Sequence, residues 1–240
     1  MAIIHTVSDL IDRRAQKKAQ TRELVRTTAH RLFAARGFDQ VTIADVAREA
    51  DVAVQTVFNH FATKEDLFFD GRVPWVEGVA KAVVDREPGV GPLFALRTHL
   101  LEFMTDQLSR MSSDEERSFR ATLQDSEALR THERTLVFEA EHRLADALLA
   151  AWEQGDEGGE CAPRRPSIAA PLTAAIWLAA VRVLIVENRL RVTEGLDAAA
   201  AAATVQEVGD RILARMHAGS EAINALVIPD AEPTTDRRAG

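Results

Sequence analysis

The 240-residue sequence predicts an all-α protein, on three observations. Apolar residues recur at steps of three and four along almost every long segment, the alternation typical of strands is scarce, and alanine is abundant. Apolar residues make up 46% of the chain and charged residues 28%. This composition excludes collagen-like, low-complexity and wholly disordered chains. The length allows one large domain or two small ones, with a substantial buried core.

The first predicted helix runs from Thr21 to Arg36. Five apolar residues share one face of it: Leu24, Val25, Ala29, Leu32 and Phe33. Gly37 follows the last periodic residue, and we expect it to end the helix in a left-handed conformation. Phe38 should then fold back onto the helix.

Two shorter helices follow, over residues 43–50 and 54–61, joined by a turn of about three residues. Thr42 with Asp45 is an Asp version of the capping box, and Thr63 with Asp66 marks the start of a fourth helix in the same way. We expect the second helix to bury Ile43, Val46 and Ala47. The third helix carries an apolar stripe of Val54, Val57, Phe58 and Phe61. Opposite it lies a polar stripe of Gln55, Thr56, Asn59 and His60.

Two short helices joined by a tight turn, the second polar on its outward face, are typical of a helix-turn-helix. Gln and Asn side chains can pair bidentately with adenine, Thr can touch the thymine methyl group, and His can reach a phosphate. Thr42 and Lys64 stand at helix N-termini, which favour phosphate. On spacing alone, an ordinary solvated helix face explains the polar stripe about as well.

Residues 21–68 resemble the N-terminal DNA-binding domain of the TetR family of transcriptional regulators. The residues that carry the resemblance are Ala29 and Phe33, Gly37-Phe38, Thr42-Ile43, Ala47, Phe58-Asn59-His60-Phe61 and Lys64-Glu65-Asp66-Leu67. The resemblance implies that Gln55, Thr56 and Asn59 face bases. It implies that Thr42, His60 and Lys64 face phosphates.

Three residues depart from the family pattern. Asp51 stands where the turn usually has Gly, so we expect a strained φ there, which Asp tolerates better than most residues. Ala53 replaces the usual Ser before the third helix and removes a side-chain cap. Phe58 replaces the frequent Tyr and removes a phenol that often reaches phosphate.

We expect a basic extension over residues 1–20, a DNA-binding domain over 21–70, a ligand-binding and dimerisation domain over 71–228 and a disordered tail over 229–240. The segment before the first helix supplies five basic residues, Arg13, Arg14, Lys17, Lys18 and Arg22. It is either an arm along the DNA backbone or minor groove or a solvated disordered tail. The net charge of −8 is uneven, because residues 1–68 hold ten Lys or Arg against nine acidic residues. The acidic remainder should limit indiscriminate DNA binding.

The resemblance implies a helical C-terminal domain whose last two long helices form a homodimer interface. Residues 167–191 and 196–225 are the corresponding apolar segments, and ordinary intrachain core helices are the alternative. The candidate ligand-pocket residues are Trp75, Phe103, Met104, Leu108, Phe119, Phe138 and Trp177, although plain core positions explain each of them more readily. Residues 68–102 also resemble a TetR subgroup with acyl-CoA-like ligands; a flat apolar drug-like effector is the rival.

No nucleophile, phosphate-loop, dinucleotide or metalloprotease motif is found, so we expect neither an enzyme nor a cofactor or metal site. The chain has a single cysteine, Cys161, and its N-terminal apolar stretch is too short and too soon interrupted by charged residues for a signal peptide. Both features favour a cytoplasmic protein, with no membrane span. The apolar stretch 168–186 contains Pro171 and Arg182 and is interpreted as a buried helix. The sequence therefore predicts a homodimeric, ligand-responsive transcriptional regulator that binds an operator in double-stranded DNA. A repressor released by a small apolar or acyl-type effector is favoured, and the alternative is a helical carrier or enzyme with a vestigial DNA-binding domain.

Overall fold

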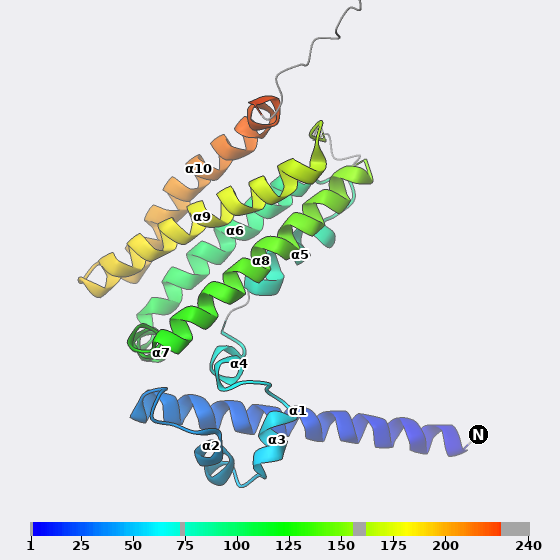
Figure 1. Ribbon diagram of the computed structural model, residues 1–240, viewed down its shortest axis with the longest axis vertical. Helices are drawn as coiled ribbons and strands as arrows, with labels where there is room; N and C mark the ends of the chain where they lie inside the picture. The colour runs from blue at the N-terminus through cyan, green and yellow to red at the C-terminus, as the bar shows by residue number, and fades with distance from the viewer. Residues whose placement is uncertain (1, 73–74, 156–161, 227–240) are drawn as a thin grey trace, which may run out of the picture. The chain divides into compact units, whose positions relative to one another are not determined.

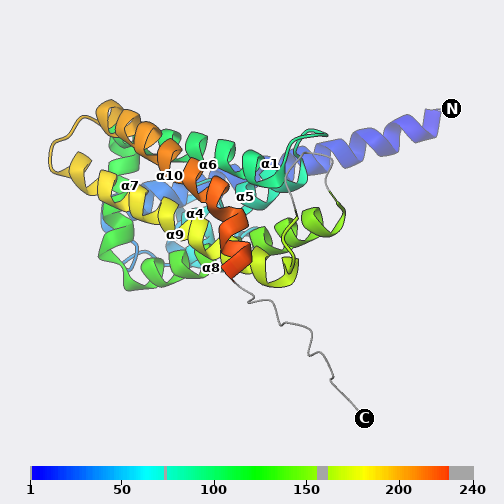
Figure 2. The ribbon, with the colours of Figure 1, turned by 90° about the horizontal axis from the view of Figure 1, so that it is seen from above.

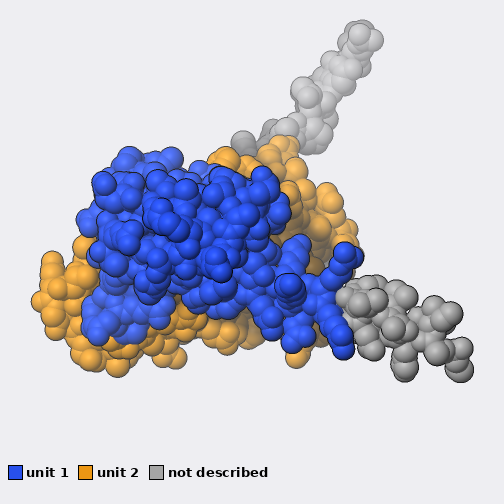
Figure 3. Space-filling model, turned by 90° about the horizontal axis from the view of Figure 1, so that it is seen from below, with its two compact units in different colours: residues 1–74, 113–135 blue, residues 75–112, 136–240 orange. Residues whose placement is uncertain are grey.

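The computed structural model describes residues 2–72, 75–155 and 162–226, and the side chains of 13–72, 78–155 and 162–219. Within these ranges every regular element is a helix and no strand occurs, which confirms the all-α prediction (Figure 1). The chain divides into two compact units, coloured separately in Figure 3. Unit 1 comprises residues 1–74 and 113–135, and unit 2 comprises residues 75–112 and 136–240. The predicted tail, 229–240, lies outside the described residues.

Unit 1 contains α1 (Ala2–Arg36), α2 (Ile43–Glu49), α3 (Val54–Phe58), α4 (Lys64–Phe69), α7 (Asp114–Asp125) and the start of α8 (Glu127–Glu153). Helix α1 begins at Ala2 rather than Thr21, so the basic extension continues the first helix instead of preceding it. Residues 113–135 join this unit, although the sequence groups them with the C-terminal domain.

An aromatic cluster forms the core of unit 1. Gly37 has φ 79° and ends α1, and Phe38 folds back so that its ring lies 5.1 Å from that of Phe33; both expectations are confirmed. The ring of Phe68 on α4 lies 5.9 Å from Phe33 and stacks on Phe119 of α7 at 4.6 Å. Of the apolar face expected on this helix, Val25, Ala29, Leu32 and Phe33 are buried, whereas Leu24 at its edge is 49% exposed.

Unit 2 contains α5 (Trp75–Val84), α6 (Pro92–Ser109), the 3₁₀ helix η1 (Arg110–Ser112), the rest of α8, α9 (Pro166–Thr193) and α10 (Ala198–Leu226). Helices α6, α9 and α10 pack against one another, as Figures 1 and 2 show. A Cβ added to Gly209 on α10 would come within 2.9 Å of the Met104 side chain on α6. Glycine therefore allows α10 to approach α6 closely.

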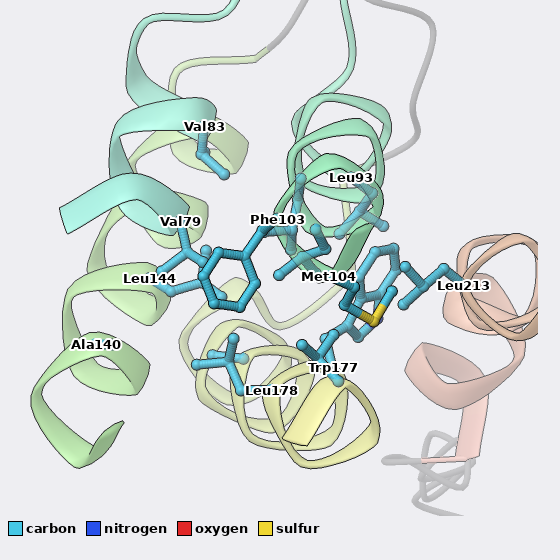
Figure 4. Close-up of a cluster of buried hydrophobic side chains, with 14 of the residues drawn as sticks. Val79, Val83, Leu93, Phe103, Met104, Ala140, Leu144, Trp177, Leu178 and Leu213 are labelled. Carbon is cyan, nitrogen blue, oxygen red and sulfur yellow. The ribbon is translucent and has the colours of Figure 1, made fainter. Parts of the chain in front are cut away.

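Helix α9 is long and apolar enough to cross a membrane, with a mean hydropathy of 2.0 over its richest 18-residue window. Core helices of soluble proteins pass the same test. Here α9 buries Trp177, Leu178 and Val181 in the hydrophobic core of unit 2, part of which Figure 4 shows. One face of α9 is thus a core face, as predicted for residues 168–186.

Candidate nucleic-acid interface

The start of α2 is built as the sequence predicts. Thr42 is the N-cap: its hydroxyl accepts a hydrogen bond from the Asp45 amide at 3.1 Å, and the Asp45 carboxylate accepts one from the Thr42 amide at 3.0 Å. The Thr42 hydroxyl also donates to the Asp45 carboxylate at 2.6 Å, and this hydrogen bond, followed by that from the Thr42 amide and then by Arg48, lowers the pKa of Asp45 to about 2. The capping box therefore stays intact at neutral pH, and it leaves Thr42 exposed at a helix N-terminus.

The turn between α2 and α3 spans Asp51 to Ala53. Asp51 has φ 52°, the left-handed conformation that the sequence predicts where the family has glycine. Ala53 is the N-cap of α3 and makes no side-chain hydrogen bond there. The amide of Val52 donates to the carbonyl of Ala47 at 2.9 Å, which closes the turn against α2.

The outward face of α3 carries two side-chain amides. Gln55 and Asn59 are both exposed, and Nε2 of Gln55 donates to Oδ1 of Asn59 at 3.3 Å. Val57, on the opposite face, is fully buried and anchors the helix to the core of unit 1. Thr56 is half-buried, so it lies at the edge of the exposed face.

The predicted apolar stripe is wrong at two of its four positions. Val57 and Phe61 are buried, whereas Val54 is 42% exposed and Phe58 is 46% exposed. The stripe requires one helix from residue 54 to residue 61, but α3 ends at Phe58. Phe61 therefore reaches the core from the following turn, and the side of α3 that carries Val54 and Phe58 stays in solvent.

Arg22 of α1 holds the end of α3 in place. Its Nη1 donates to the carbonyl of His60 at 2.6 Å, its Nη2 pairs with Asp70, and its guanidinium lies 4.3 Å from the centre of the Phe61 ring. Burial, followed by the charges of Arg22 and Lys18, lowers the pKa of His60. The half-buried His60 imidazole is therefore neutral at pH 7 and can offer a phosphate one N–H.

Lys64, predicted to face phosphate, is engaged within the chain. Its ammonium donates to the carbonyls of Phe38 and Val41, both at 3.1 Å, and lies 4.0 Å from the centre of the Phe38 ring. Two of its three N–H groups are thus used. Because Val41 precedes Thr42, the contact also holds the N-terminus of α2.

The other predicted basic residues lie on α1. Arg13, Arg14, Lys17 and Lys18 are all exposed on the helix. Their regular presentation along a helix contradicts the disordered-tail alternative, and the arm along the DNA backbone or minor groove stays a prediction. Their charge can still attract a phosphate backbone without reading its sequence.

The predicted pocket residues do not all lie together in the structure. Phe103, Met104, Leu108 and Trp177 lie together in the core of unit 2, where Figure 4 shows Phe103, Met104 and Trp177. Phe119 instead stacks on Phe68 in unit 1. Phe138 of α8 is 60% exposed. Trp75 lies outside the residues whose side chains are described.

One network in unit 1 was not predicted from the sequence. His30 of α1 contacts the carbonyl of Leu67 through Nε2 at 3.2 Å and accepts a hydrogen bond from Nε of Arg72 at Nδ1, at 3.3 Å. Arg72 also pairs with Glu115 of α7 at 2.6 Å. These partners are 37 to 43 residues apart in sequence. No local pattern indicates them.

Unit 1 is thus a helix-turn-helix unit that presents a short helix with an exposed face carrying two amides. Residues 25–70 match the family model described as "Bacterial regulatory proteins, tetR family". The HTH-type transcriptional regulator TcmR of Streptomyces glaucescens is 31% identical over 83 residues, which are 35% of this chain and 37% of TcmR. The matched stretch therefore spans little more than a third of that relative. Residues 25–70 are therefore similar to the TetR family of bacterial regulators.

Two solved structures share the fold over most of the chain. Native NalD, the secondary repressor of the MexAB-OprM multidrug efflux pump in Pseudomonas aeruginosa, has a TM-score of 0.51 at 21% identity, over 83% of this chain and 96% of NalD. The complex of SmeT with triclosan has a TM-score of 0.52 at 16% identity, over 79% of this chain and 90% of SmeT. SmeT is the repressor of the SmeDEF multidrug efflux pump of Stenotrophomonas maltophilia. At these identities the similarity establishes the fold alone.

Proposed function

We propose that this protein is a homodimeric transcriptional repressor of the cytoplasm, released from its operator by a small-molecule effector. The observation that carries the DNA-binding part is the exposed face of α3. Gln55 and Asn59 stand there on a short helix anchored at Val57 and held at its end by Arg22. Amide side chains presented rigidly in this way suit the adenine edge in the major groove. Thr42 and His60 flank them as phosphate contacts, and Thr56 lies at the edge of the base-reading face.

We assign Lys64 an indirect part in this interface. Its ammonium binds the carbonyls of Phe38 and Val41 and so positions Thr42 and the N-terminus of α2 that Thr42 caps, which faces a phosphate. The exposed cations of α1 add affinity that is independent of sequence.

The proposed dimer uses the exposed face of α9. Five large apolar residues of α9 are at least 38% exposed: Ile168, Ile176, Val183, Val186 and Leu190. The last four, together with Ala179, recur at steps of three and four, which is the pattern of a helix that packs against another helix. A second copy of the chain is the proposed partner, because one short reading helix needs a second half-site for useful affinity.

The proposed effector is small and largely apolar. It would bind in unit 2 near Phe103, Met104 and Trp177, which lie together between α6 and α9. The structure of SmeT with triclosan, a fold relative, supports a small apolar molecule more directly than an acyl-type one. Helix α8 contributes residues to both units, so we propose that it transmits the response. A coupling free energy of about 1–3 kcal/mol is sufficient for such a response.

The test begins with selection of binding sites from random double-stranded DNA. A specific duplex with two related half-sites is expected, and Gln55→Ala with Asn59→Ala should lose it while dimerisation and folding persist. Gln154→Ala, at an exposed amide in unit 2 outside α9 and α10, is the matched control. Failure to select any duplex, or unchanged affinity of the double variant, would overturn the proposal and favour the helical carrier or enzyme.

A further inference from the structure

The exposed face of α3 carries two apolar side chains beside its two amides. On a helix with about 100° between successive residues, Val54 and Phe58 form one ridge and Gln55 and Asn59 a parallel ridge about 100° away. The four side chains occupy one continuous arc of about 140°, and Val57 lies about 130° from the middle of that arc. An apolar ridge thus borders the polar ridge along the whole helix.

The apolar ridge has no partner among the described residues of unit 1 that would bury it. Val54 is 42% exposed and Phe58 is 46% exposed, whereas Val57 between them is fully buried. Single exposed apolar residues are ordinary, but two adjacent ones on a five-residue helix make a patch. Because the same helix carries Gln55 and Asn59, the patch enters any groove that these amides enter.

The chemistry of the major groove offers one apolar partner. Each T·A pair presents the thymine C5-methyl group there, beside the adenine edge that Gln and Asn read. Valine and phenylalanine side chains can bury that methyl group but cannot make a hydrogen bond to any base. Phe58 also lacks the phenol with which a tyrosine would reach a phosphate, so its ring is left to make apolar contacts.

We propose, resting on the proposed function above, that Val54 and Phe58 determine specificity by packing against thymine methyl groups of the operator. Gln55 and Asn59 then read adenines, and the apolar ridge reads the methyl groups of adjacent or opposite thymines. The half-site should therefore contain A·T pairs at neighbouring positions, with thymine at a position where cytosine is not tolerated.

The experiment replaces thymine by uracil in the selected duplex, which removes the methyl group and leaves the base-pairing and hydrogen-bonding groups unchanged. Burial of one methyl group is worth about fourfold in an equilibrium constant. Replacement of the contacted thymine in both half-sites should weaken binding by the wild-type protein on the order of tenfold. Uracil at thymines outside the half-sites is the matched DNA control and should leave the affinity unchanged.

Protein variants then assign the effect to the ridge. The double variant Val54→Ala with Phe58→Ala should bind the thymine and uracil duplexes with nearly equal affinity. The ratio of the two affinities, about tenfold in the wild type, should fall to about one or two. Phe94→Ala, a substitution at an exposed phenylalanine of unit 2, should keep the full ratio.

Two results overturn the proposal. One is wild-type binding that no thymine-to-uracil replacement weakens. The other is a Val54/Phe58 variant that still binds the thymine duplex about tenfold more tightly than the uracil duplex, which would assign the methyl contact to Thr56. Both results require a selected duplex, so they are distinct from failure of the proposed function, in which no specific duplex is found.

Discussion

The Gln55 side chain donates a hydrogen bond from Nε2 to Oδ1 of Asn59 at 3.3 Å, across one turn of the exposed surface of α3. The bond sets the orientation of both amides before DNA arrives. It leaves the carbonyl oxygen of Gln55 and the amide nitrogen of Asn59 open to a partner. The major-groove edge of adenine offers both a donor and an acceptor, so it can hydrogen-bond with these two groups without reorienting either amide.

This relationship predicts that the two amides act as a unit. Gln55→Ala and Asn59→Ala should each cost about 1–3 kcal/mol in operator binding. The double variant should cost less than the sum, because each single substitution already disorders the remaining amide. Equilibrium binding to the selected duplex by the four proteins of the cycle measures the coupling. Strict additivity would show that the hydrogen bond has no part in recognition.

Lys64→Met tests whether the ammonium serves the fold or the DNA. Methionine keeps most of the side-chain volume but leaves the carbonyls of Phe38 and Val41 without their donor. We expect the free energy of unfolding to fall by about 1–3 kcal/mol, as for other buried groups left unsatisfied. Chemical denaturation measures this loss.

The salt dependence of DNA binding distinguishes the two parts that Lys64 can play. If Lys64 positions Thr42, the slope of log affinity against log salt stays at the wild-type value in Lys64→Met. A phosphate contact would instead lower that slope by about one for each protomer. Lys18→Met, at an exposed cation on α1, is the matched variant that should lower it.

His30 gives the fold of unit 1 a pH dependence. Burial, followed by the charge of Arg72, lowers the pKa of His30 from its ordinary value of 6.5. The unfolded chain binds the proton more readily than the folded chain. The stabilising contribution is therefore complete above about pH 6.5 and is lost as the pH falls from there towards the lower folded pKa.

The measurement is urea unfolding at several pH values between 7.5 and 5. His30→Gln can keep both hydrogen bonds, since an amide both donates and accepts, but it cannot titrate. It should flatten the loss of stability over this range. His60 and His99, whose pKa values are also lowered by burial, supply the dependence that remains. Phe138→Ala, at a 60% exposed position, should leave the parent profile, and an equal effect of both variants would contradict the assignment.

Phe119 is expected to stabilise unit 1 rather than to contact an effector. Its ring stacks on Phe68 at 4.6 Å and lies 6.1 Å from Phe69. Phe119→Ala should lower the free energy of unfolding by about 3–5 kcal/mol. Phe138→Ala, at a 60% exposed position, should change it by less than about 0.5 kcal/mol. Hydrogen exchange should become faster in α1 and α4, where the stability is lost. Faster exchange confined to α6 and α9 would instead support the predicted place of Phe119 in the ligand pocket.

Local chemistry explains which features could be predicted from the sequence. The capping boxes at Thr42 and Thr63, and the left-handed residues Gly37 and Asp51, depend on neighbours within four residues, and all four are confirmed. The exposure of Phe58 depends instead on where α3 ends. A helix one turn longer would place the same residue against the core.

Long-range contacts account for what the sequence could not indicate. Arg22 and Lys64 are both basic residues beside a DNA-binding motif, which indicates phosphate contacts. Yet Arg22 pairs with Asp70, 48 residues away, and Lys64 bonds carbonyls up to 26 residues away. The position of Phe119 depends likewise on the packing of α7 against α4. Periodicity identifies a buried face but not the element that covers it.

The dimer proposal predicts the effect of charge on the exposed face of α9. Val183 is 53% exposed and Leu190 is 52% exposed, and the two lie seven residues apart, two turns along one face. In a monomer, a glutamate at either position would lie in solvent. In an interface between two α9 helices it would be buried opposite the same residue of the second copy, with no positive charge to pair with. Val183→Glu with Leu190→Glu should therefore yield a folded monomer by analytical ultracentrifugation, with operator binding weakened at least 100-fold as one half-site is lost. Val84→Glu, at a 65% exposed position on α5, should remain dimeric and bind normally. A dimer that survives both α9 substitutions would place the interface on another face of unit 2.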